Sequence, residues 1–213
     1  MAKVTGPLLS VAAGGQIAKT QVYSSWRGVP YARRYVQPSN PRSTGQTATR
    51  SVFSWSSNVW KIAGALFTAP WAAAAKGQPY TDRNLFIGQN TKKLRNQTSL
   101  ADMIFSPGAG GGLPPTALTI TSSSGSMVAT TTNPTAPADW TLAGMTAIAI
   151  KQENPGTATV YQSYAASATT PFTSATLTPL AAGTYEVGAF LQWTKPDGST
   201  AYSPDIKNVG SAT

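Results

Sequence analysis

The 213-residue sequence contains no cysteine and no histidine, and only seven of its residues are acidic. The chain therefore has no disulfides or thiolate ligands, and it lacks the commonest general base near neutral pH. The seven carboxylates are scattered singly, so neither a carboxylate pair nor an oxygen-rich metal loop is evident. Without histidine, no serine or threonine can belong to a triad. We expect no catalytic residues, no metal site and no cofactor, and we predict that the chain is not an enzyme.

Long apolar runs are also missing. The first residues lack the apolar segment of a secretion signal. The apolar patch from Ile62 to Ala75 is interrupted by Gly64, Thr68 and Pro70, whereas a membrane-spanning helix needs about 20 apolar residues. We therefore expect no membrane span.

The chain contains few charged residues, and these are distributed unevenly along it. Hydrophobic residues make up 41% of the sequence and charged residues 11%, which is typical of a folded protein. Up to Gly112 there are 13 basic and 2 acidic residues, a balance of +11, and from Leu113 onward there are 3 basic and 5 acidic, a balance of −2. The asymmetry predicts two domains, of which the basic one faces a negative partner.

The stretch from Gln21 to Arg50 combines five arginines with four tyrosine or tryptophan residues and contains no carboxylate. Nothing nearby in the sequence can neutralise these arginines, and Arg, Tyr and Trp are the residues enriched at interface hot spots. A solvated face and phosphate contacts remain as alternatives. The predicted partner-binding residues are Trp26, Arg27, Tyr31, Arg33, Arg34, Tyr35, Arg42 and Arg50.

The first half of the chain predicts a small, basic α+β domain over residues 21–105, preceded by an extended arm over residues 1–20. Strand-like runs at 16–26 and 29–37 are joined by Arg27-Gly28, which suits a tight hairpin turn. Apolar residues at helical spacing predict a helix over 44–63, followed by short helices at 70–77 and 83–96. The same spacing places three tryptophans in a core: Trp55, Trp60 and Trp71.

The second half predicts a different architecture. Residues 106–115 are rich in Gly and Pro and are expected to form a linker. Residues 116–213 contain short Thr/Val/Ile/Tyr-rich runs separated by turn residues, including the turn Lys195-Pro196-Asp197-Gly198. Six or seven strands in about a hundred residues predict a β-sandwich. The predicted fold class is mainly β: a hairpin plus short helices, then the sandwich.

The C-terminal segments PTALTIT, ADW and GTYEVGAFLQWTKPDGSTAYSP resemble a fibronectin type III or immunoglobulin-like (Ig-like) domain over roughly residues 113–213. In such domains a buried tyrosine is common where Tyr185 lies, and an early core tryptophan where Trp140 lies. The resemblance implies that the sandwich is Ig-like.

The N-terminal half is similar to small proteins of tailed-bacteriophage structural modules, through the segments GPL, VYSSWRG, YARRYVQPSNPRSTGQ, WK and DRNLFIGQN. Together the two resemblances imply a minor capsid protein of the decoration or cement type. Its basic domain would bind the major capsid protein lattice, and its Ig-like domain would be displayed. The expected location is the capsid surface of a virion assembled in the bacterial cytoplasm, with the chain as a homo-oligomer on the particle.

Two other functions remain open at this point. The chain could be a tail or neck structural protein whose Ig-like domain contacts the host surface or other virion proteins. It could also be a nucleic-acid-binding packaging accessory that uses the basic half. No RNP-like motif, zinc finger or helix-turn-helix in the sequence supports sequence-specific recognition of nucleic acid.

Overall fold

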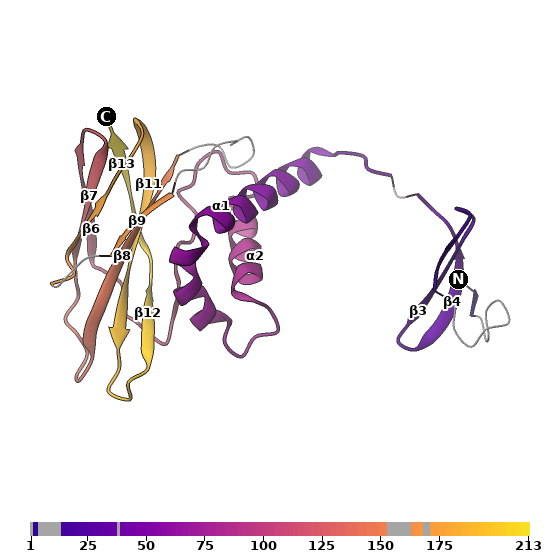
Figure 1. The fold of residues 1–213 in the computed structure, drawn as a ribbon, viewed down its shortest axis with the longest axis horizontal. Coiled ribbons are helices and arrows are strands. Elements are labelled where there is room, and N and C mark those ends of the chain that lie inside the picture. Colours follow the sequence, from indigo (N-terminus) through magenta and orange to yellow (C-terminus); the bar gives the residue numbers. More distant parts are fainter. Residues whose placement is uncertain (1, 4–13, 38, 153–162, 168–170) are drawn as a thin grey trace. The chain divides into compact units, whose positions relative to one another are not determined.

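The computed structural model describes residues 2–3, 14–37, 39–152, 163–167 and 171–213. The chain divides into two compact units, Met1–Arg42 and Ser43–Thr213, and each is described separately below. The fold is mainly β and contains three antiparallel sheets in the described residues (Figure 1). Neither helix of this described part is both long and apolar enough to cross a membrane.

The first unit is a four-stranded antiparallel sheet with the strand order β1-β4-β3-β2. Part of the expected arm, residues 1–20, instead supplies the two edge strands, and residues 4–13 lie outside the described residues. The bounds are β1 Ala2–Lys3, β2 Gly15–Ile17, β3 Gln21–Trp26 and β4 Val29–Arg34.

The turns of this sheet explain one correct and one wrong prediction. The β3–β4 hairpin is confirmed, and its turn residues Arg27 (φ 49°) and Gly28 (φ 78°) both take the positive φ of a type I′ turn. The single strand expected over residues 16–26 is wrong. Ala18 (φ 44°) and Lys19 (φ 55°) reverse the chain there, and the Thr20 N–H donates to the Ile17 carbonyl at 2.9 Å.

The second unit begins with two helices, α1 at Thr44–Ala75 and α2 at Asp82–Leu94. The separate helices expected at 44–63 and 70–77 are one continuous helix, which bends along its length in Figure 1. Pro70 has no N–H to donate and crowds the preceding turn, which bends a helix without necessarily ending it. The fully buried Trp71 holds the segment beyond the proline in the core. The Thr81 hydroxyl caps α2 by accepting from the Asn84 N–H at 3.3 Å.

Two antiparallel sheets follow. One has the order β10-β7-β6, and the other has the order β5-β12-β11-β8-β9 with β13 also paired to β11. The turn expected at 195–198 is confirmed, since the Gly198 N–H donates to the Lys195 carbonyl at 2.9 Å. The strands of the two sheets are β5 Pro107–Ala109, β6 Ala117–Ser123, β7 Ser126–Thr132, β8 Thr141–Lys151, β9 Ser163–Ser167, β10 Ser174–Leu177, β11 Gly183–Thr194, β12 Thr200–Pro204 and β13 Ile206–Ala212.

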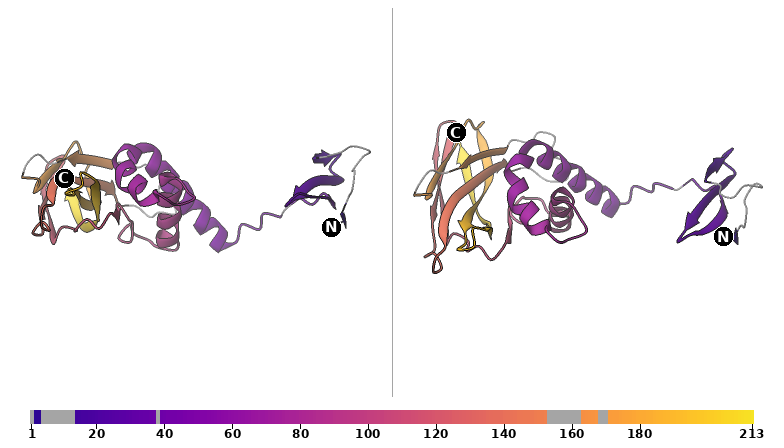
Figure 2. Two further views of the ribbon diagram at one scale, coloured as in Figure 1. Left: turned by 90° about the horizontal axis from the view of Figure 1, so that it is seen from below. Right: turned by 60° about the horizontal axis from the view of Figure 1, so that its bottom comes forward.

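The larger sheet is buried on both faces. Tyr185, Val187 and Leu191 of β11 pack toward the three-stranded sheet, whereas Phe190 packs with Trp55 among the side chains of the helices. Figure 2 shows the resulting layers, with the helices on one side of the larger sheet and the smaller sheet on the other. Burial on both faces explains why β8 and β11 are apolar at consecutive positions and do not alternate. Trp55 and Trp71 are buried and Trp60 is half-buried, so the prediction that these residues are core is confirmed.

A segment over residues 100–106 connects the helices to the sheet, and we call it the strap. Trp71 Nε1 donates to the Phe105 carbonyl at 2.9 Å, and the buried Asn90 side chain exchanges two hydrogen bonds with the Ile104 backbone, at 2.8 and 3.1 Å. The Ser106 hydroxyl donates to the Ser203 carbonyl at 2.6 Å. The strap therefore uses its backbone groups to join both layers.

The strap continues directly into β5, so the linker expected over 106–115 is not a linker. Pro107–Ala109 pairs with β12, and a Cβ added to Gly112 would lie 2.5 Å from the backbone of Tyr202. The helices of residues 44–94 and the sandwich of residues 116–213 accordingly form one compact unit, and the division falls after Arg42 instead. Gly112 here permits close packing against β12. The composition of the segment alone does not show whether its glycines allow close packing or form a flexible linker.

Substituting Gly188 tests how tightly the strap is packed. A Cβ at this position would lie 2.3 Å from the Phe105 ring, so we expect Gly188→Ala to lower the free energy of unfolding by about 1–3 kcal/mol. The matched control is Gly88→Ala in α2, where a Cβ meets nothing within 4 Å and alanine favours the helix by roughly 0.5–1 kcal/mol. Urea unfolding followed by circular dichroism measures both. Equal stabilities for the two variants would contradict the described packing.

Candidate partner-binding site

The sheet of the first unit has two chemically different faces. Residues paired across antiparallel strands point to the same face, and the pairs Val22 with Arg33, Ser24 with Tyr31 and Trp26 with Val29 therefore share one. Lys3 of β1 pairs with Tyr31 and joins them. Gln16 of β2 pairs with Val22 and also belongs to it. We call this surface, formed by Lys3, Gln16, Val22, Ser24, Trp26, Val29, Tyr31 and Arg33, the Trp26 face.

The opposite surface has no tryptophan, and Arg34 is its one cation among the described strand residues. It combines Ile17 and Gln21 with Tyr23, Ala32 and Arg34, according to the same pairing. The Tyr23 hydroxyl donates to Gln21 Oε1 at 3.1 Å, so part of its hydrogen-bonding capacity is used within the sheet. We call this surface the Tyr23 face.

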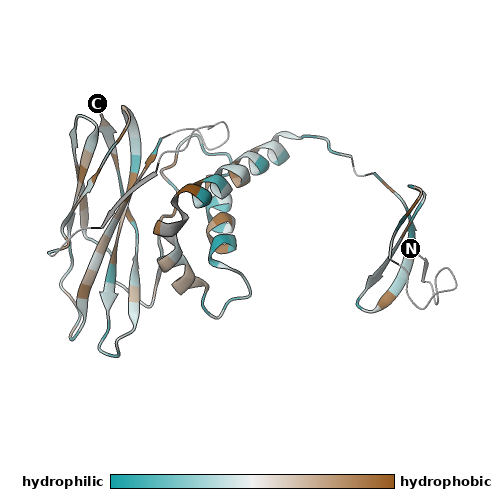
Figure 3. Ribbon diagram, viewed as in Figure 1, coloured by the Kyte–Doolittle hydropathy of each residue, from teal (hydrophilic) through white to brown (hydrophobic). Residues whose placement is uncertain are grey.

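Neither face of the sheet has a core beneath it. Among residues 14–37 and 39–42 none is buried, and Trp26 is 69% exposed. Figure 3 shows hydrophobic and hydrophilic residues mixed along these strands. Small antiparallel sheets gain their stability from packing on a hydrophobic face, so this unit has the surface of a sheet that needs a partner.

The charge of this unit has one sign. Residues 1–42 contain six basic residues and no acidic residue, and the first carboxylate in the chain is Asp82. The Arg27 guanidinium lies 5.8 Å from the centroid of the Trp26 ring, which is within the range of a cation–π contact. A negatively charged partner would therefore meet an uncompensated positive surface that carries an exposed tryptophan.

Of the eight predicted residues, five lie in this sheet and Tyr35 directly follows its strand β4. Trp26, Arg27, Tyr31 and Arg33 lie on the Trp26 face or its turn, and Arg34 lies on the opposite face. Tyr35 follows β4 and its N–H donates to the Thr20 carbonyl at 2.8 Å.

The remaining two predicted residues lie outside the sheet. Arg42 is exposed at the end of the first unit, and Arg50 belongs to α1 in the second unit. Sequence reasoning missed Lys3, Val22 and Val29 on the Trp26 face. Val22 and Val29 follow from the strand alternation once the hairpin register is fixed, but the contribution of Lys3 depends on β1, which has no sequence signal.

This surface combines cations, aromatic rings and valine side chains. In the described part of the chain, no three His, Cys, Asp or Glu residues lie close enough together to hold a metal ion. No protein-family model matches the chain, and no curated protein matches its sequence.

The other notable polar cluster lies in the second unit, under the strap. Glu186 is 3% exposed, and its Oε2 has no hydrogen-bond partner among the described residues. Burial raises the pKa of Glu186, and Lys207 opposes that rise. Burial also raises the pKa of Asp205, although its Oδ1 accepts from the Ser106 N–H. Lys207 Nζ donates to the Ala101 and Met103 carbonyls, at 2.7 and 3.0 Å, so this cluster fastens the strap to the sheet.

The raised pKa of Glu186 predicts a pH-dependent stability. Above about pH 4.5, its ordinary pKa, the unfolded chain releases this proton while the folded chain retains it, so the contribution of Glu186 to stability falls until the raised folded pKa is passed. We expect Glu186→Gln to show a smaller fall in the free energy of unfolding than the parent chain as the pH rises from 4.5. Urea unfolding at several pH values measures this, and Asp139→Asn, at an exposed carboxylate, is the control. Parallel pH profiles for Glu186→Gln and the parent would contradict the prediction.

The absence of buried residues in the described part of the first unit predicts how a truncated chain behaves. Both hydrophobic cores lie within residues 43–213, so we expect that fragment to melt within about 2 °C of the full chain in differential scanning calorimetry. We expect a peptide of residues 1–42 to show no cooperative melting by itself. A large loss of stability in the fragment would show that residues 1–42 contribute to a core.

Proposed function

We propose that this chain is a non-enzymatic structural protein of a tailed-bacteriophage particle, and that it attaches to the capsid lattice through the Trp26 face. The observation that carries the proposal is the sheet of the first unit, in which none of residues 14–37 and 39–42 is buried and which combines aromatic residues with basic residues and no acidic one. The phage-like motifs of the N-terminal half point to the same class of protein. The partner is a carboxylate-bearing protein surface, in the first place the major capsid protein.

The composition of the Trp26 face suits such a partner. Trp26, Tyr31 and Arg33 are of the three residue types most enriched at binding hot spots, and they share one face with two valines. Arginine pairs with carboxylates through two parallel hydrogen bonds, which fix orientation as well as add affinity. The exposed ring of Trp26 supplies apolar area beside these charges.

Two features of residues 116–213 support an Ig-like module. The three-stranded sheet β10-β7-β6 and the neighbours β8, β11 and β13 of the larger sheet correspond to the E-B-A and C-F-G orders of such domains. Tyr185 is fully buried at the start of β11, and its hydroxyl donates to the Ala181 carbonyl at 2.7 Å, as in a tyrosine corner. In our proposal this module is displayed from the particle surface.

Many attached copies would stabilise the shell through mass action. A protein that binds only the assembled lattice shifts the equilibrium toward assembly, by an amount set by its concentration relative to its dissociation constant. If copies associate on the particle, several modest contacts act together as avidity. The same attachment could occur on a tail or neck, and labelling of intact particles with an antibody against residues 116–213 distinguishes these locations.

Single-stranded nucleic acid is the second candidate partner, and one observation favours it. Trp26 and Tyr31 lie on the same sheet face as Lys3 and Arg33, and aromatic rings flanked by cations form stacking platforms for bases. Fluorescence anisotropy with a labelled oligonucleotide over a range of salt concentrations tests this function. Binding whose affinity falls steeply with salt supports it, and no binding at low ionic strength eliminates it.

Charge reversal at two adjacent positions tests the proposed attachment. Arg33 and Arg34 are neighbours in β4 but lie on opposite faces of the sheet, so each variant controls for the other. We expect Arg33→Glu to lower incorporation into particles on the order of tenfold or more, because it places a carboxylate against a carboxylate surface. We expect Arg34→Glu to change incorporation by less than about threefold. Quantitative immunoblotting of purified particles gives the copy number.

The two variants have the same net charge, so a difference between their copy numbers on the particle shows which face of the sheet binds. Circular dichroism of each purified variant checks that both remain folded. Equal and full incorporation of both would refute attachment through the Trp26 face, and purified particles without this chain would refute the proposed function as a whole.

A further inference from the structure

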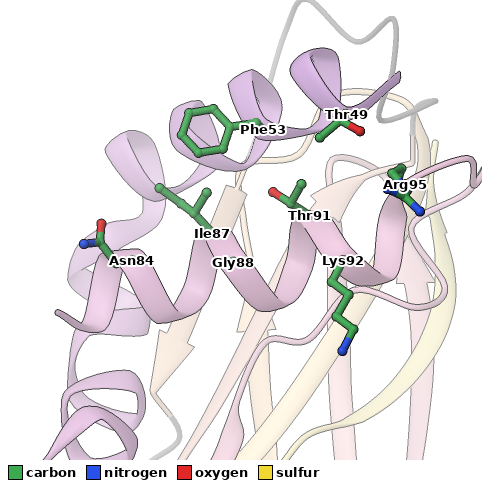
Figure 4. A pocket seen from close by; sticks show the side chains of 8 residues that line it. All are labelled: Thr49, Phe53, Asn84, Ile87, Gly88, Thr91, Lys92 and Arg95. Atoms are coloured by element: carbon green, nitrogen blue, oxygen red, sulfur yellow. The ribbon is translucent and has the colours of Figure 1, made fainter. Parts of the chain in front are cut away.

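A groove of about 580 Å³ runs between α1 and α2 on the helical layer of the second unit (Figure 4). Phe53 of α1 forms one side and is 54% exposed, and Ile87 and Gly88 of α2 form the floor. A Cβ at Gly88 would meet nothing within 4 Å, so the groove is open above this residue. This is an apolar surface that the described residues of the second unit leave uncovered.

The groove continues along the helices in both directions. Toward the start of α1 it shares Thr49 and Arg95 with a hollow that reaches Ser43 and Arg50. Toward the start of α2 it shares Asn84 and Lys92 with a hollow that reaches Tyr80. The distance from Asn84 to Arg95 along the axis of α2 is about 16 Å, which is the length of an eleven-residue helix.

The polar groups of the groove have one sign of charge. Lys92 and Arg95 line it, Arg50 lines its continuation toward the start of α1, and none of the residues that line the groove or its two continuations is acidic. Lys92 and Arg95 are three positions apart and therefore project from the same side of α2.

We propose that this groove binds an acidic amphipathic segment of a partner protein. An apolar side chain of the segment covers Ile87 and Gly88 against Phe53, and its carboxylates pair with Lys92 and Arg95. This is the recognition mode in which a helix lays its apolar face into a groove, with charge complementarity fixing the direction. The inference goes beyond attachment through the Trp26 face and does not depend on it, because the groove lies entirely within residues 43–213.

The observations favour a protein segment over nucleic acid. Phe53 and Ile87 supply the apolar side chains of the groove, and its two cations, Lys92 and Arg95, lie in the last turn of α2 and directly after it. Nucleic-acid binding surfaces instead present a basic track along the whole backbone, with aromatic rings spaced for successive bases. A second copy of this chain fits the groove poorly, because its seven carboxylates are scattered singly and form no acidic segment.

The test uses the full chain and a labelled probe. The probe is a fluorescein-labelled peptide of about fourteen residues, with leucines at helical spacing and glutamates on both sides of that stripe. We expect saturable binding by fluorescence anisotropy, at least about tenfold weaker binding of the same peptide with glutamine in place of glutamate, and no displacement by a single-stranded oligonucleotide of equal charge.

Matched variants locate the binding. We expect Lys92→Glu to weaken binding about tenfold or more, and Lys93→Glu to change it by less than about twofold, because Lys93 has the same charge on the same turn but does not line the groove. We expect Gly88→Leu to weaken binding similarly while the melting temperature holds or rises, because leucine fills the open floor and favours the helix. Arg33→Glu should bind the peptide normally, which separates this inference from the proposed attachment.

Each contrary outcome overturns the inference. No saturable binding of the acidic peptide, or equal losses for Lys92→Glu and Lys93→Glu, would show that the groove does not select carboxylates. Full binding by Gly88→Leu would place the peptide elsewhere. Displacement by the oligonucleotide would identify a nucleic-acid site in place of a protein-binding one.

Discussion

The second unit depends on the way the strap, residues 100–106, is held between the helices and the larger sheet. Its backbone groups bond to Trp71 and Asn90 on the helical side and to Asp205 on the sheet side, and the Phe105 ring occupies the space left by Gly188. Buried backbone groups must find partners, and here the two layers supply them. The helices and the sandwich consequently form one body, although the composition of the chain changes sharply between them.

The two units obtain their order in different ways. In residues 43–213 two hydrophobic cores share the larger sheet, and the apolar area that they bury is the main stabilising contribution. In the described part of residues 1–42, strand pairing and tight turns hold the sheet without any buried side chain. Two of its turn residues, Ala18 and Lys19, also adopt left-handed backbone angles that are unfavourable for residues other than glycine. Such a sheet gains most from a surface that covers it.

The sequence predicted local structure well where a single rule about neighbouring residues determines that structure. Arg27-Gly28 predicted a hairpin turn, and helical spacing predicted Trp55 and Trp71 in a core, because these signals depend on a few neighbouring residues. The predictions for Pro70 and for residues 106–115 were wrong, since tertiary packing kept α1 continuous and used glycine for close contact with β12. The separation of Arg33 and Arg34 onto two faces follows from the alternation of side chains along a strand, whereas the residues of β3 that share each face with them required the strand register.

The alternation along β4 has a consequence for how its six residues, Val29–Arg34, respond to substitution. Odd-numbered positions of this strand belong to one surface and even-numbered positions to the other, so this strand, none of whose residues is buried, can contact two neighbouring molecules at once. Tolerance in a saturation scan would then rise and fall with a period of two residues when one face is occupied. When both faces are occupied, every position of the strand would become intolerant of substitution, and the sheet would lie between two adjoining molecules.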